Sequence, residues 1–210
     1  MAYEKSLAGG SSDHATTNDS HYASQTPNRR RWTDVLMHRW PTALGIAIAA
    51  LAALDLQDVQ EGLEFAALTV LMALVYLGAA ALDRRWSAWV VLLAGLAFLI
   101  PSTSEVVPSV VLLVAAPVFL VLGVVRGQLR KPGGLPLQTA GMLVFGSIIL
   151  VALFYVDPDL GGKLVGIAIL GHAAWDAYHY LRDRVVASSY AEFCGVLDLL
   201  VGAALLFMTS

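Results

Sequence analysis

Cysteine, charge and lysine are all scarce in this chain of 210 residues. A single cysteine, Cys194, excludes an intrachain disulfide, so packing alone must hold the fold together. Charged residues make up 14% of the chain and hydrophobic residues 58%, whereas an average soluble domain is about 25% charged. The net charge is −3, and no basic cluster exists beyond residues 29–31, so the sequence makes no case for nucleic-acid binding. These deficits are typical of an integral membrane protein whose main partner is the lipid bilayer.

The distribution of lysine bears on which class of membrane protein this chain can belong to. Retinal proteins form a Schiff base on a lysine in their last helix. The last apolar segment of this chain contains no lysine, which argues against that class.

Residues 1–40 differ in composition from the rest of the chain. They are rich in Ser, Thr, Asn, Asp and Gly, and they contain no apolar run of the kind found in a secretory signal. Such a segment cannot bury enough apolar surface to offset the entropy lost on ordering. We therefore expect residues 1–40 to form a disordered cytoplasmic tail and residues 41–210 to form a transmembrane domain.

Apolar segments separated by short polar breaks fill the rest of the chain. A helix needs about 20 residues to cross the hydrocarbon core, and the first and third segments are shorter than that. The sequence nevertheless predicts an all-α, polytopic (multi-pass) protein with seven transmembrane helices. The segments are about 41–56, 63–82, 86–100, 106–125, 138–156, 163–181 and 190–208.

The basic residues test this division independently. If all seven segments span, 12 of the 13 lysines and arginines fall on one side of the membrane, and only Lys163 falls on the other. Because cytoplasmic loops carry an excess of Lys and Arg, we predict that the N-terminus is inside and the C-terminus outside. Arginine also heavily outnumbers lysine and alanine is abundant, which is typical of a GC-rich bacterial genome. The expected location is therefore a bacterial plasma membrane.

Ionisable residues within the predicted membrane depth are confined to the last two segments. His172, Asp176 and His179 follow one another at i, i+4 and i+7, which places them on one face of a helix. If the last two helices are antiparallel, residue numbers at equal depth sum to about 371. His172 is then level with Asp198, and Asp176 is near Cys194 and Gly195.

Three functions remain open for this constellation. A divalent metal site, with Zn²⁺ as the most suitable ion, would use His172, Asp176, His179 and Asp198 and would suit a metal-dependent membrane hydrolase. Two further residues are weaker candidate ligands, namely Cys194 and Glu192, although Glu192 points roughly 120° away from Asp198.

The second function is a proton or ion path, as in a proton-coupled transporter, in which His172 and Asp198 titrate. The third is structural: Asp198 accepts a hydrogen bond from His172 and holds two helices in register. No known metal-binding signature is matched, and the sequence leaves the reaction and its small-molecule or lipid substrate open. Of the three, we take the metal site as the working hypothesis.

Overall fold

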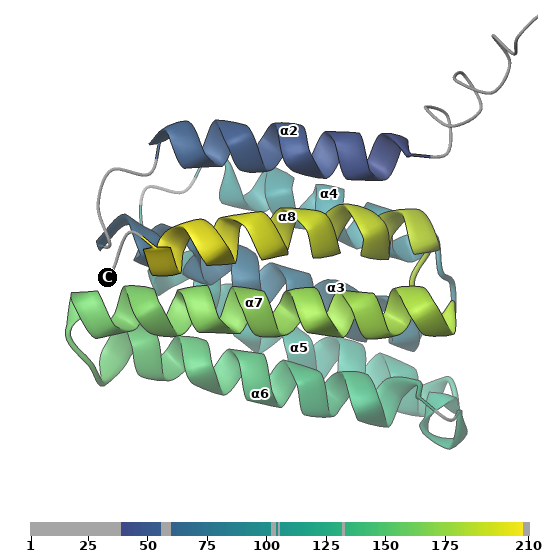
Figure 1. The fold of residues 1–210 in the computed structure, drawn as a ribbon. Helices are drawn as coiled ribbons and strands as arrows, with labels where there is room; N and C mark the ends of the chain where they lie inside the picture. The colour runs from purple at the N-terminus through teal and green to yellow at the C-terminus, as the bar shows by residue number, and fades with distance from the viewer. Residues whose placement is uncertain (1–38, 56–59, 102–103, 105, 132, 208–210) are drawn as a thin grey trace, which may run out of the picture.

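Each of the seven apolar segments folds as an α-helix (Figure 1). The computed structural model describes residues 39–55, 60–101, 104, 106–131 and 133–207, and these contain no strand. Two short 3₁₀ helices, Gln60–Phe65 and Gln128–Arg130, interrupt the connections. The helices are α2 (Trp40–Asp55), α3 (Ala66–Leu82), α4 (Ser87–Leu99), α5 (Val106–Val125), α6 (Leu135–Phe154), α7 (Pro158–Arg182) and α8 (Ser188–Phe207).

The start of α7 differs most from the sequence-based expectation. The helix was expected to begin at about Lys163, after the pair Gly161 and Gly162. It begins instead at Pro158, because Asp157 caps it by accepting a hydrogen bond from the Leu160 backbone N–H at 3.1 Å. The glycines serve packing: a Cβ at Gly161 would lie 2.7 Å from the carbonyl oxygen of Ala152 on α6.

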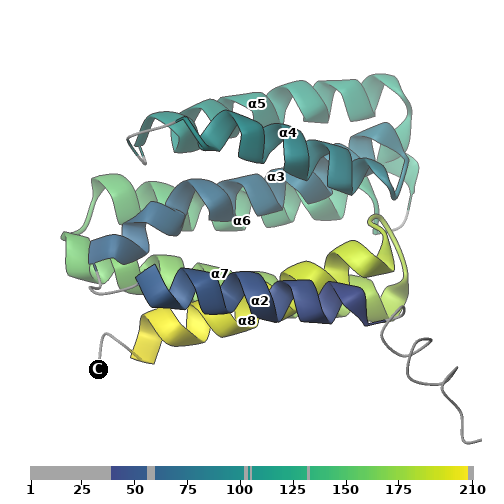
Figure 2. The ribbon, with the colours of Figure 1, turned by 90° about the horizontal axis from the view of Figure 1, so that it is seen from above.

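Helix α3 lies at the centre of the bundle. Nearly all of its side chains are buried, and it packs against α4, α5, α6 and α7. Seen from above, α3 and α6 lie between the pair α4 and α5 and the trio α2, α7 and α8 (Figure 2). A helix that is apolar on every face is stable where other helices or lipid surround it, and α3 is surrounded by helices.

Small residues bring the outer helices close together. A Cβ at Gly45 would lie 2.8 Å from the carbonyl oxygen of Phe193, so α2 and α8 meet at this glycine. On the other side of α8, a Cβ at Gly202 would lie 2.9 Å from Leu170 of α7. Close backbone approach of this kind is a common basis for helix packing in membranes.

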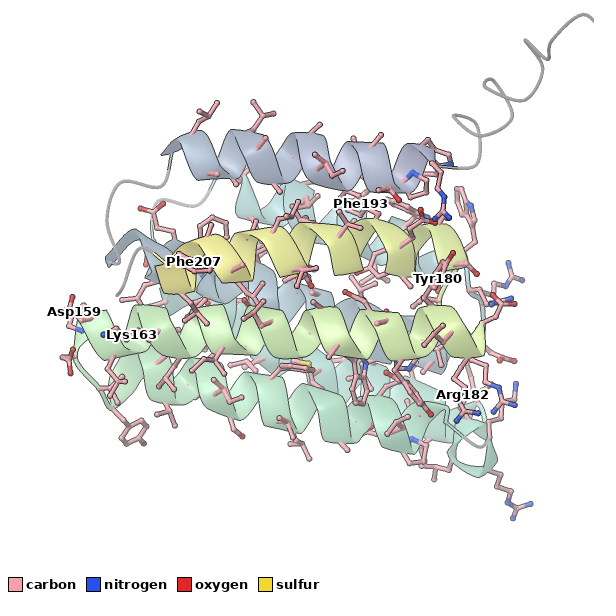
Figure 3. All side chains as sticks on the ribbon, in the orientation of Figure 1. Asp159, Lys163, Tyr180, Arg182, Phe193 and Phe207 are labelled. Carbon is pink, nitrogen blue, oxygen red and sulfur yellow. The ribbon has the colours of Figure 1, made fainter. Side chains whose placement is uncertain are left out.

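The two ends of the bundle differ in charge. Of the nine described basic residues, eight lie at or beside the connections at the end that Arg182 marks in Figure 3, and Lys163 lies at the opposite end with Asp159. Helix α2 begins at the basic end, and α8 finishes at the other end with Phe207. An odd number of antiparallel helices accounts for this arrangement.

Four helices are long and apolar enough to cross a membrane. These are Gly62–Leu82, which includes part of the first 3₁₀ helix, and the helices α5, α6 and α8. Helices α2 and α4 are apolar but shorter, and α7 is 25 residues long but carries the polar constellation. Seven spans with the N-terminus inside and the C-terminus outside stay a prediction, and the expected disordered tail lies, up to residue 38, outside the described residues.

Candidate metal centre

The pairing of α7 with α8 brings the polar residues together. His172 Nδ1 lies 2.8 Å from Asp198 Oδ2, so the two residues face each other across the helix contact. One turn further along α7, a Cβ at Gly195 would lie 3.2 Å from the Cβ of Asp176. Both pairings confirm the depth register that the antiparallel arrangement predicted.

Three potential metal ligands converge at this point. His172, Asp176 and Asp198 each offer one ligand atom, and these atoms lie within 4.8 Å of one another. Asp176 Oδ2 is 3.3 Å from the same Nδ1 atom of His172 that contacts Asp198. All three residues are essentially excluded from solvent, with exposed fractions of 0%, 0% and 1%. We call these three residues the His/Asp triad.

Tyr76 of α3 orients one member of the triad. Its hydroxyl donates a hydrogen bond to Asp176 Oδ1 at 2.5 Å, and its side chain is buried. The Tyr76 ring also contacts the His172 ring edge-on, with the ring centroids 5.5 Å apart. Because Oδ1 is held by Tyr76, the other carboxylate oxygen of Asp176 is left to face His172.

Two buried atoms of the triad have no hydrogen-bond partner among the described residues. Asp176 Oδ2 is one, since its contact with His172 Nδ1 lies outside hydrogen-bonding geometry, and His172 Nε2 is the other. Leaving a buried polar atom unpaired costs about 1–3 kcal/mol, and more when the group is charged. An unpaired carboxylate oxygen beside two other ligand atoms is the position that a bound cation would satisfy.

The spacing of the triad fits a small divalent ion. Bonds of about 2.0–2.2 Å in a tetrahedral site place neighbouring ligand atoms about 3.3–3.6 Å apart. Asp198 Oδ2 and Asp176 Oδ2 lie 2.8 and 3.3 Å from His172 Nδ1, and all three ligand atoms lie within 4.8 Å of one another, so a modest adjustment reaches these distances. Imidazole and carboxylate ligands suit Zn²⁺, and three protein ligands leave a fourth position open.

His179 stands outside the triad because both of its ring nitrogens are engaged elsewhere. Nδ1 donates to the Trp175 carbonyl oxygen at 2.8 Å, and Nε2 accepts from the Gln138 side-chain amide at 2.9 Å. Gln138 in turn accepts from the Trp175 indole N–H at 3.3 Å and donates to the Gly133 carbonyl oxygen at 3.2 Å. This network links α6 to α7 and uses the polar groups of His179 and Gln138 completely.

A shared helix face does not by itself bring two side chains to one metal ion, because residues on that face are also separated along the helix axis. His172 and His179 do lie on the same side of α7, but seven residues separate them along the axis by about 10.5 Å. The ligands of one ion must come within a few ångströms of one another, so two histidines two turns apart cannot serve the same ion unaided.

The two weaker candidate ligands also lie outside the triad. Glu192 accepts hydrogen bonds from Arg39 and from the Thr42 hydroxyl, so it connects α8 to the start of α2. Cys194 is buried on α8 but does not belong to the group of converging ligand atoms.

Sequence reasoning missed Tyr76 and Gln138. Both contact the constellation from other helices, and both are polar residues within otherwise apolar segments. That isolation was the available signal, because a polar side chain inside a membrane helix tends to face a partner in the bundle.

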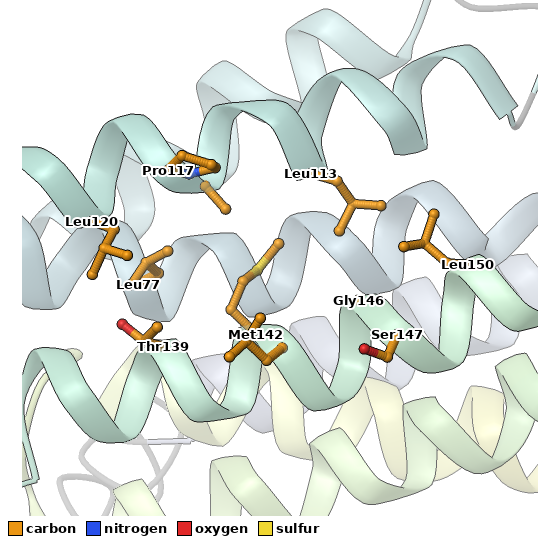
Figure 4. A pocket seen from close by; sticks show the side chains of 11 residues that line it. Leu77, Leu113, Pro117, Leu120, Thr139, Met142, Gly146, Ser147 and Leu150 are labelled. Carbon is orange, nitrogen blue, oxygen red and sulfur yellow. The ribbon is translucent and has the colours of Figure 1, made fainter.

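A separate cavity between α3, α5 and α6 offers no comparable chemistry (Figure 4). Its volume is about 210 Å³, and its described lining includes Leu77, Pro117 and Met142 but no titratable side chain. Ser147 lines the cavity, but no base lies nearby to activate it as a nucleophile.

Comparison with protein-family models, with curated proteins and with solved structures finds no match for this chain. The function proposed below therefore rests on the triad.

Proposed function

We propose that this chain is an integral membrane protein that binds a divalent metal ion, with Zn²⁺ the best suited, at His172, Asp176 and Asp198 between α7 and α8. The membrane is the expected bacterial plasma membrane, with the basic end of the bundle on the cytoplasmic side. Four helices that are long and apolar enough to span, and the concentration of basic side chains at one end, support this placement.

One observation carries the metal proposal. Asp176 Oδ2 is buried without a hydrogen-bond donor among the described residues, although it lies 3.3 Å from His172 Nδ1 and close to Asp198. Burying an unpaired carboxylate is expensive, and a cation bound by the triad would offset that cost. The pairing of His172 with Asp198 leaves this oxygen of Asp176 without a donor, and the Tyr76 hydroxyl serves only the other oxygen.

The chemistry that follows is metal-assisted hydrolysis. A Zn²⁺ ion held by these three residues would supply an activated water at neutral pH. The residues of this chain would hold the site: Tyr76 fixes the Asp176 carboxylate, and the packing of α7 against α8 keeps His172 and Asp198 side by side.

The test is metal content. Protein purified without added chelator is expected to contain about one equivalent of metal, and Asp176→Asn and His172→Ala are each expected to remove most of it because each deletes one of about four ligands. Glu192→Gln is the matched control, since Glu192 lies on α8 but outside the triad. His179→Ala is expected to retain the metal, because His179 is held by Gln138 and Trp175.

A second measurement distinguishes a loss of metal binding from misfolding of a variant. Thermal unfolding of the wild-type protein in detergent is expected to shift upward with added Zn²⁺ and downward with chelator, and the Asp176→Asn protein should lose both responses. Metal-free wild-type protein that keeps its full thermal stability in chelator would contradict the proposal. If Asp198→Asn then abolished a proton flux through reconstituted protein, the transporter hypothesis would replace it, and a silent substitution would leave the structural role.

A further inference from the structure

The basic end of the bundle contains a cavity that is separate from the triad. It lies where the connection between α3 and α4, the connection between α5 and α6 and the connection between α7 and α8 meet. Its volume is about 280 Å³, and two small residues at the end of α3, Ala79 and Ala80, contribute to its lining. The charged residues that line it are Asp83, Arg84, Arg85, Lys131, Asp183 and Arg184.

Two of the four basic side chains are already paired. Lys131 forms an ion pair with Asp83 at 2.5 Å, which ties the connection after α5 to the end of α3. Arg85 forms an ion pair with Asp183 and also donates to the Val186 carbonyl oxygen at 3.2 Å, which ties the start of α4 to the turn before α8. These pairs hold the three connections around the cavity and neutralise both of its acidic groups.

The other two basic side chains are available. The guanidinium groups of Arg84 and Arg184 make no hydrogen bond or ion pair with any other residue in the described part of the chain. The two arginines come from different connections, distant in sequence, and both line the same cavity. The lining therefore carries an excess of two positive charges.

A buried amide in the same lining lacks a good partner. Gln128 is 8% exposed, and its Oε1 atom has no hydrogen-bond partner within the described residues. Its Nε2 atom reaches only the Arg126 carbonyl oxygen, at 3.5 Å, which is the long limit of a hydrogen bond. Turning the amide over gives up only this long hydrogen bond, leaves no donor facing the Arg126 carbonyl, and presents the two N–H donors on the side where Oε1 now lies unpaired.

We propose that this cavity binds a phosphate group, held by Arg84, Arg184 and the Gln128 amide. Guanidinium groups bind phosphate oxygens through paired, charge-assisted hydrogen bonds, and a buried amide adds a neutral donor. The site lies at the end of the bundle that we place at the cytoplasmic membrane surface, where both anionic phospholipid headgroups and soluble phosphorylated molecules occur. Both kinds of molecule present a negatively charged phosphate oxygen, and this is the group that the site would bind.

Thermal unfolding and calorimetric titration of the full chain in detergent test this site with two probes. The probes are inorganic phosphate, compared with chloride at equal ionic strength, and short-chain phosphatidylglycerol, compared with short-chain phosphatidylcholine. We expect at least one probe to bind and stabilise the wild-type protein. The double variant Arg84→Gln/Arg184→Gln should lower the affinity about tenfold or more, since each substitution removes a charged hydrogen-bond donor.

The matched control is Arg130→Gln/Arg182→Gln, which removes the same charge from the same end without touching the cavity lining. It should keep the wild-type affinity within about twofold, because exposed charges at a distance are screened by salt. Phosphate that binds alone or displaces the lipid indicates a soluble phosphorylated ligand, whereas binding of phosphatidylglycerol alone indicates a headgroup, and both support the site. Equal losses in the two double variants, or no binding of either probe, would overturn it.

Discussion

Replacing Tyr76 by phenylalanine removes a single hydroxyl from the centre of the protein. That hydroxyl donates to Asp176 Oδ1 at 2.5 Å, and it connects the central helix α3 to α7. Since Asp176 Oδ2 has no hydrogen-bond partner among the described residues, Tyr76→Phe would leave the whole carboxylate without one. The ring itself stays, so its contacts with His172 and His179 are kept.

The expected cost follows from the burial of both partners. Tyr76 is 1% exposed and Asp176 is 0% exposed, so water cannot replace the lost hydrogen bond. Orphaning a buried acceptor costs about 1–3 kcal/mol, with charged groups at the upper end. We therefore expect the free energy of unfolding of Tyr76→Phe, measured by denaturant titration in detergent with chelator present, to fall by about 2–3 kcal/mol.

Tyr190→Phe is the matched control. Tyr190 is equally buried and its ring contacts Tyr76, but the neighbour of its hydroxyl is only the weakly polar Cys194 thiol and not a carboxylate. Removing that hydroxyl should change the free energy of unfolding by less than about 1 kcal/mol. Equal effects of the two substitutions would refute the argument that Tyr76 supports the Asp176 carboxylate.

Three further predictions concern packing, surface charge and topology. Gly45→Ala should destabilise the protein by about 1–3 kcal/mol, because the new Cβ meets the Phe193 carbonyl oxygen at 2.8 Å. Gly171→Ala meets only Phe145 at 3.5 Å and should be neutral or stabilising by up to about 1 kcal/mol in the same unfolding titration; the reverse order would contradict the α2–α8 contact. Hydrogen bonds from Arg85 and Ser188 lower the pKa of Asp183, so Asp183 contributes stability at neutral pH that is lost as the pH falls through its lowered pKa. Arg85→Gln should raise that pKa toward its ordinary value in an NMR titration, and an unchanged pKa would refute the role of Arg85. Reporter fusions in the N-terminal tail and after Ser210 should report opposite sides of the membrane, and a common side would mean that one of the short helices, α2 or α4, does not span.

Much of the architecture and all three residues of the triad were predictable from local properties of the chain. The apolar segments matched seven helices because a run of apolar residues between polar breaks needs no long-range information to be recognised. The antiparallel order of the last two segments placed His172 opposite Asp198 because the helical rise is constant. Helix boundaries were less predictable: α7 begins at Pro158 and not at Lys163, and only the cap at Asp157 and the contact of Gly161 with Ala152 show why.

Only the tertiary structure decided which polar residues share a site. The sequence by itself determined that His172, Asp176 and His179 lie on one face of a helix, because that depends on spacing alone. It did not determine that Tyr76 approaches Asp176 from α3, or that Gln138 approaches His179 from α6, because helices distant in sequence meet through the packing of whole faces. Tyr76 supports Asp176, which joins His172 and Asp198 in the triad, whereas Gln138 and the Trp175 carbonyl engage both ring nitrogens of His179 and keep it outside.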